Sequence, residues 1–210
     1  ESAVMLLLYL GKVPGTSITY DGSNFVPKVR GKTGVDPLRP YSGSIKANGG
    51  FLAYSDSSWG DNYPMFGFVV YLFGGIVSFA SKQLKVVAFS SCEAEYAAAA
   101  YCCREIAFIR AICADMGYVL NGSLVLIVDN TAAIDVAENV GVTARTKHFD
   151  MCVHYFRDLV QMGKVAPVHV LTTYQRADGF TKGLDKTKFL EWMLGLYDVR
   201  INPIYKGVLK

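Results

Sequence analysis

A helix that opens with two glutamates constrains this chain more than any other stretch. Ser90-Ser91-Cys92-Glu93-Ala94-Glu95-Tyr96, followed by four alanines, begins the strongest helical pattern in the sequence. Steps of three and four residues from Glu95 reach only small or apolar side chains: Ala98, Ala99, Cys102, Ile106, Ile109 and Cys113. Glu95 therefore heads the face that we expect to be buried. A carboxylate there costs free energy unless a metal, a cation or hydrogen-bond donors compensate it.

Glu93 lies two residues earlier, so about 200° separates it from Glu95 around a helix of 3.6 residues per turn. Its own face is more mixed and includes Arg104. Only one of the two acids can point toward the packed side, and we predict that it is Glu95. We expect Glu93 at the surface or in an outer layer around any site that Glu95 forms.

The chain from Gly50 onward predicts a mixed sheet with helices on its faces. The uninterrupted apolar run 124–128 is typical of a central strand covered on both faces. The expected strands are 51–56, 65–73, 76–80, 124–128 and 165–171, and the expected helices are about 90–115, 131–138, about 147–162 and much of the region from Gln175. This order indicates an α/β fold with a five-stranded sheet, three antiparallel strands followed by parallel additions.

Composition narrows the class of protein. Hydrophobic residues make up 51% and charged residues 19%, which excludes a disordered chain. A net charge of +3 permits a nucleic-acid partner without requiring one. The five cysteines include no Cys-x-x-Cys pair, and four fall in the expected helix 90–115, so we interpret them as packing residues in a reducing compartment. No apolar run reaches the ~20 residues that cross a membrane, and we expect a soluble, intracellular protein with no membrane partner.

Four acids occupy positions where they can converge. Asp56 lies in the first strand on the face of Leu52 and Tyr54, Asp129 ends the apolar strand, and Asp178 begins the last helical region. If the first and fourth strands are neighbours, a helix packed on that face brings Glu95 to Asp56 and Asp129. Carboxylates this close repel one another and raise one another's pKa values, and Mg²⁺ relieves the repulsion. Taken singly, each acid has an ordinary explanation as a helix cap or a partner of the helix dipole.

Five short motifs around these acids occur in a fixed order. They are Tyr54-Ser55-Asp56-Ser57-Ser58-Trp59, Ser90-Ser91-Cys92-Glu93-Ala94-Glu95-Tyr96, Val128-Asp129-Asn130, Arg145-Thr146-Lys147-His148-Phe149-Asp150 and Ala177-Asp178-Gly179-Phe180-Thr181-Lys182. Together they resemble the ribonuclease H domain of copia-type (Pseudoviridae-like) retrotransposon polyproteins. Residues 1–47 resemble the tail of the reverse transcriptase segment that precedes it. We therefore expect that tail and a linker at 1–47, an RNase H-like domain at 48–195 and a C-terminal tail at 196–210.

The resemblance implies an RNase H-like fold and a metal-dependent endonuclease that hydrolyses the RNA strand of RNA–DNA hybrids by two-metal-ion catalysis. The implied cofactor is a pair of Mg²⁺ ions, with Mn²⁺ as a substitute. Carried over residue by residue, the catalytic and metal-binding acids are Asp56, Glu95, Asp129 and Asp178. The implied partners are an RNA–DNA hybrid and the reverse transcriptase portion of the same polyprotein. The implied location is intracellular, in a cytoplasmic virus-like particle or the nucleus.

We also predict that Ser57, Asn130, Arg145 and Lys147 bind substrate. The basic pair lies in a loop from which it can reach backbone phosphate, although an ordinary solvated loop explains it equally well. His169 falls inside an expected strand, and we interpret it as structural.

Two departures from the family pattern weaken the expected placement of Asp178. Gly179 and Gly183 replace the apolar residue and the proline that are usual in the family, and glycine weakens a helix start by ~1 kcal/mol.

The first alternative function is a non-catalytic RNase H-like connection or binding domain of a degenerate or domesticated retroelement. The second is a transposase or integrase on the same fold, which the early placement of Glu95 disfavours.

Overall fold

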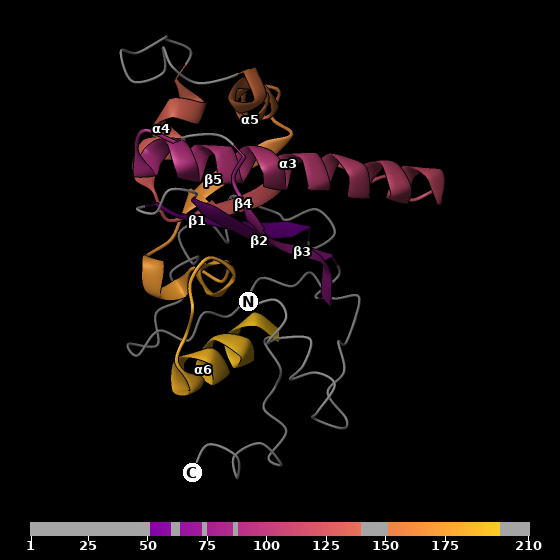
Figure 1. Ribbon diagram of the computed structural model, residues 1–210. Coiled ribbons are helices and arrows are strands. Elements are labelled where there is room, and N and C mark those ends of the chain that lie inside the picture. Colours follow the sequence, from indigo (N-terminus) through magenta and orange to yellow (C-terminus); the bar gives the residue numbers. More distant parts are fainter. Residues whose placement is uncertain (1–50, 60–63, 73–74, 86–87, 140–150, 198–210) are drawn as a thin grey trace.

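The computed structural model gives the arrangement of the chain from β1 to α6 (Figure 1). It describes residues 51–59, 64–72, 75–85, 88–139 and 151–197. The segment 1–47, nearly all of the tail at 196–210, and the residues Arg145, Lys147 and His148 lie outside these ranges, so the predictions that concern them stay predictions.

The five expected strands form one sheet in the order β3-β2-β1-β4-β5. The strands are β1 (Leu52–Ser58), β2 (Met65–Leu72), β3 (Gly75–Gln83), β4 (Leu124–Val128) and β5 (Val165–His169). Antiparallel pairing joins β1 to β2 and β2 to β3, whereas β1 pairs in parallel with β4, and β4 with β5. The predicted mixed sheet, with three antiparallel strands and then parallel additions, is confirmed.

The helices follow the predicted order. They are α3 (Ser91–Asp115), α4 (Thr131–Glu138), α5 (Met151–Gln161) and α6 (Lys186–Tyr197), with two short 3-10 helices, η2 (Thr172–Tyr174) and η3 (Asp178–Phe180), before α6. No helix among the described residues is both long enough and apolar enough to cross a membrane. Cys92, Cys102, Cys103 and Cys113 form no disulfide, and the last three are buried.

Alternation along β1 determines which layer each side chain joins. Phe51 and Ala53 pack with residues of α3, α4 and α5, whereas Leu52 and Tyr54 pack with residues of α6. Figure 1 shows the resulting layers, with α3 crossing one face of the sheet and α6 beyond the other. Because both faces are covered, β1 and β4 are buried along nearly their whole length, as the apolar run in β4 predicted.

The start of α3 explains Glu93. The hydroxyl of Ser90 accepts a hydrogen bond from the N–H of Glu93 at 3.2 Å, and Glu93 Oε2 accepts one from the N–H of Phe89 at 2.8 Å. This reciprocal arrangement is a variant of the capping box, which satisfies N–H groups that a helix start leaves unpaired. Glu93 is only 8% exposed. Of the two positions expected for Glu93, the surface one is therefore wrong, because capping draws the side chain back over the helix start.

Candidate metal centre

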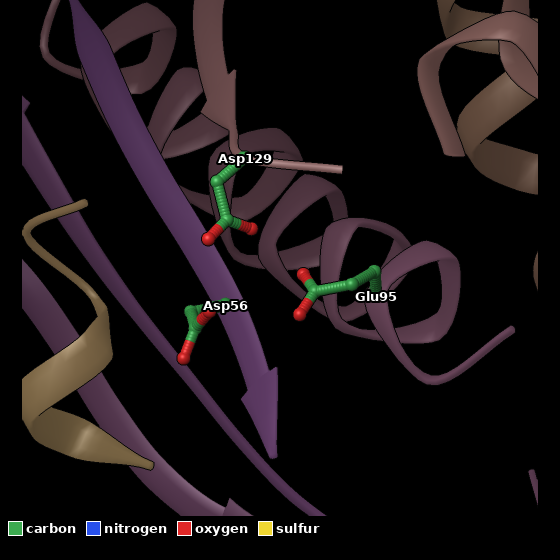
Figure 2. Close-up of side chains that lie close together, drawn as sticks. All are labelled: Asp56, Glu95 and Asp129. Carbon is green, nitrogen blue, oxygen red and sulfur yellow. The ribbon is translucent and has the colours of Figure 1, made fainter. Parts of the chain in front are cut away.

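Three carboxylates from three elements meet at one end of the sheet. Asp56 belongs to β1, Asp129 directly follows β4, and Glu95 lies near the start of α3. One oxygen of each lies within 4.8 Å of the others, and Figure 2 shows the three carboxylates pointing toward one another. The parallel pairing of Tyr54 with Ile127 explains part of this arrangement, because Asp56 and Asp129 each follow two residues later.

The route by which Glu95 reaches the aspartates differs from the expected one. Asp56 shares a face of β1 with Leu52 and Tyr54, which pack toward α6, but α3 covers the opposite face of the sheet. The expectation that α3 packs on the Leu52 face is therefore wrong. The acids meet because β4 ends at Val128, so that Glu95 reaches the two aspartates from the α3 side at the end of the strand.

Hydrogen bonds satisfy only half of the Glu95 carboxylate. The N–H and the hydroxyl of Ser57 donate to Oε1 at 2.9 and 3.0 Å. Oε2 is buried and has no hydrogen-bond partner among the described residues. A buried carboxylate oxygen without a donor is unfavourable. The structure thus leaves one oxygen of Glu95 available to a further ligand.

Two threonines that the sequence reasoning missed hold the aspartates. The hydroxyl of Thr181 donates to Oδ2 of Asp56. The hydroxyl of Thr172 donates to Oδ2 of Asp129 at 2.8 Å. His169 Nε2 lies 3.2 Å from the main-chain oxygen of Asp129, which agrees with the structural role predicted for this histidine. Each hydrogen bond fixes the orientation of an aspartate and engages only one of its two carboxylate oxygens.

Burial and mutual repulsion make the cluster costly to ionise. Burial raises the pKa of Glu95 from 4.5 to about 9, and the charges of Asp56 and Asp129 add to the effect against the opposing Ser57 hydrogen bonds. Burial likewise raises the pKa of Asp56 from 3.8 to about 7, although the Thr181 hydrogen bond acts in the opposite direction. A cation bound between these carboxylates would favour their ionised forms.

A hard divalent cation fits this donor set. Mg²⁺ prefers oxygen ligands and is commonly held by a few carboxylates together with water and phosphate. The unpartnered Oε2 of Glu95 supplies an oxygen, and the close approach of Asp56 and Asp129 supplies the charge that a cation would neutralise. A divalent cation held by these three residues would relieve both problems.

Asp178 lies beside this group but is not one of the three acids that form it. Its charge contributes to the raised pKa of Asp56, and its carboxylate forms an ion pair with Lys182. Burial alone lowers the pKa of Lys182, but the hydrogen bond and charge of Asp178 outweigh burial and leave that pKa above its usual value. Lys182 therefore pairs with Asp178, and its charge also lowers the pKa of Asp56 in the cluster.

The two described residues predicted to bind substrate have structural contacts of their own. Both donors of Ser57 are directed at Glu95. Asn130 is the N-cap of α4, and its side-chain oxygen accepts the N–H of Ala133 at 3.2 Å. Substrate contact by Ser57 and Asn130 stays a prediction.

Gly179 has a packing reason that the sequence did not reveal. A Cβ built at this position would lie 2.2 Å from Cε2 of Trp192 in α6, whereas a Cβ at Gly183 would meet nothing within 4 Å. The Trp192 ring also packs edge-on against Phe180, and its Nε1 donates to the main-chain oxygen of Arg176 at 2.8 Å. Glycine at 179 thus lets α6 pack closely on η3 and hold the segment that carries Asp178 and Thr181.

The strand order, with β4 in parallel beside β1, and the acids at the strand ends define an RNase H-like domain. No family model matches the chain. Among solved structures, RNase H1 from the halophilic archaeon Halobacterium salinarum NRC-1 is similar with a TM-score of 0.44 and 19% identity, covering 62% of this chain and 92% of that one. The Prototype Foamy Virus protease–reverse transcriptase is similar with a TM-score of 0.44 and 14% identity, covering 73% of this chain and 21% of that one.

Sequence comparison identifies the relatives. The chain is 34% identical over 162 residues to the retrovirus-related Pol polyprotein from transposon RE2 of Arabidopsis thaliana, covering 75% of this chain. It is 28% identical over 189 residues to that from transposon TNT 1-94 of Nicotiana tabacum, covering 90% of this chain. The chain is a homologue of one segment of the Pol polyproteins of copia-type retrotransposons. It spans 11% of the length of the first relative and 13% of the second.

Proposed function

We propose that this chain is a metal-dependent endoribonuclease that hydrolyses the RNA strand of RNA–DNA hybrids during retrotransposon reverse transcription. The observation that carries the proposal is the meeting of Asp56, Glu95 and Asp129 within 4.8 Å, with one buried oxygen of Glu95 left without a partner. A domain that only held duplex would have no use for a buried group of acids that is costly to ionise.

The proposed site divides its work among named residues. Asp56, Glu95 and Asp129 would hold the metal, with Asp178 as a partly exposed fourth acid. Two Mg²⁺ ions, or Mn²⁺ in their place, would activate water and stabilise the leaving oxygen of the phosphodiester. Ser57, Thr181 and Thr172 orient the three acids through the hydrogen bonds described above. Mutation of residues that support metal ligands in this way typically lowers metal affinity or activity 10- to 100-fold.

The proposed partners follow from the same site and from the relatives. The substrate would be an RNA–DNA hybrid, and one solved structure with similarity to this chain is that of LC11-RNase H1 in complex with an RNA/DNA hybrid. The reverse transcriptase portion of the same polyprotein would be the neighbouring domain, within an intracellular particle or the nucleus. Because the net charge is only +3, we expect the chain to bind hybrid weakly without that neighbour.

Incubation of the purified chain with an RNA–DNA hybrid labelled on the RNA strand tests this function. Cleavage in Mg²⁺, its loss in EDTA, and little cleavage of duplex DNA of the same sequence support the proposal. Equal cleavage in EDTA would exclude the metal mechanism. Binding of hybrid without cleavage in Mg²⁺ or Mn²⁺ would favour the non-catalytic alternative.

A further inference from the structure

A groove lies between α3 and the outer strands of the sheet, away from the carboxylates. Its volume is about 580 Å³, within the ~300–1,000 Å³ common for ligand sites. On the α3 side of the sheet, β2 presents Phe68 where its partner strand β3 presents only Ala80. Cross-strand partners share a face of the sheet. The small side chain on β3 therefore leaves space beneath α3 that the core does not fill.

Aromatic rings form one wall of this groove. The rings of Phe66 and Tyr101 stack with their centroids 4.6 Å apart, and the guanidinium of Arg104 lies 5.9 Å from the centre of the Tyr101 ring. Phe108, one turn further along α3, also lines the groove and is 60% exposed. An exposed ring beside a cation offers a surface on which a planar group can stack.

Cations lie at the rim of the groove. Lys82, Lys85 and Arg104 all line it, and none of the three forms an ion pair among the described residues. Glu105 is an acid in the lining, and its Oε1 accepts a hydrogen bond from the hydroxyl of Ser78 at 2.7 Å. Three cations against one acid give the groove a local positive charge, which favours an anionic ligand.

The groove is separate from the carboxylate cluster. Arg104 lies nine residues after Glu95 in α3, which corresponds to about 14 Å along the helix axis. No acid of the cluster lines the groove. A ligand in the groove would therefore occupy a second site on the same helix.

We propose that this groove binds single-stranded nucleic acid. Lys82, Lys85 and Arg104 would contact backbone phosphates, and a base would stack on Phe108. A positive groove with aromatic side chains is the arrangement that binds single strands with little sequence preference. An acidic peptide would satisfy the cations, but it would gain nothing from the exposed ring unless it carried aromatic side chains of its own.

Fluorescence anisotropy with the full chain in EDTA tests this site without depending on cleavage. The probes are labelled oligo-dT and oligo-U of about 12 nucleotides, a length within the usual range for one such groove. We expect the double variant Lys82→Glu/Lys85→Glu to bind at least tenfold more weakly, with a slope of log K against log salt reduced by about 1.4 for two lost phosphate contacts. Lys164→Glu, on the opposite edge of the sheet, is the matched charge control and should weaken binding far less.

The aromatic contact has its own pair of variants. Phe108→Ala should weaken binding about tenfold, as the loss of one stacked base predicts, whereas Met162→Ala, with a similarly exposed side chain, should leave it unchanged. Weaker binding by the groove variants of oligo-dT alone, or of oligo-U alone, supports the site and shows whether it prefers DNA or RNA. Equal binding by wild type and all groove variants overturns the proposal. The proposal is also overturned if poly-glutamate displaces the probe as well as unlabelled oligo-dT does at the same concentration of charge. Because the assay measures binding in EDTA, failure of the cleavage proposal would not affect this result.

Discussion

Replacing Glu95 with glutamine should stabilise the metal-free chain at neutral pH. The unfolded carboxyl has a pKa of 4.5 and the folded one a pKa of about 9, so folding takes up a proton anywhere between these values. Stability therefore falls as pH rises through this window. Each pH unit above 4.5 costs about 1.4 kcal/mol, which gives an upper limit of about 3.4 kcal/mol at pH 7. Glutamine removes this cost and keeps an oxygen to accept the two Ser57 hydrogen bonds.

Thermal unfolding in EDTA measures the effect. With roughly 2–4 °C per kcal/mol for a domain of this size, the Tm of Glu95→Gln should exceed that of wild type by several degrees at pH 7. The difference should disappear near pH 4.5. Glu93→Gln is the control, because glutamine also completes a capping box, and its Tm should stay close to that of wild type at both pH values. An unchanged or lower Tm for Glu95→Gln at pH 7 would refute the description of Glu95 as a buried, under-compensated acid.

Three further predictions rest on the same contacts. Mg²⁺ should raise the Tm of wild type more at pH 8 than at pH 6, because a metal must displace protons from Glu95 and Asp56; a larger rise at pH 6 would contradict the raised pKa values. Thr181→Val should lower the apparent Mg²⁺ affinity in cleavage about tenfold by freeing Asp56, and wild-type metal dependence would count against that role. Gly179→Ala should cost about 1–3 kcal/mol in urea unfolding through overpacking, whereas Gly183→Ala should be nearly neutral; equal effects would mean that Trp192 does not restrict position 179.

Local pattern was enough to predict the parts of the fold with a single strong signal. The apolar run of β4 and the short helix α4 have the bounds expected from sequence. The unbroken apolar stretch ends at Val128, directly before Asp129, and Asn130 caps the helix that begins at Thr131. The approach of Asp56 to Asp129 was also predictable, since it requires only that β1 and β4 be neighbours.

Features that depend on the path of a loop were not predictable. Thr172 and Thr181 reach the aspartates only because η2 and η3 fold back over the strand ends. The need for glycine at 179 depends on Trp192, thirteen residues later in α6. Local pattern does not predict which face of the sheet α3 covers. Alternation in β1 shows that the two faces of the strand differ, but it does not show which helix packs on each face.

The cleavage rate of Asp129→Asn tests the central claim most directly. Asparagine preserves the shape of the side chain and an oxygen that can accept the Thr172 hydrogen bond, but it removes a charge from the three-acid cluster. With the RNA-labelled hybrid and a series of Mg²⁺ concentrations, we expect cleavage by Asp129→Asn to fall to background at every concentration while its Tm in EDTA stays at or above that of wild type. Cleavage at the wild-type rate by this folded variant would contradict a metal centre formed by Asp56, Glu95 and Asp129.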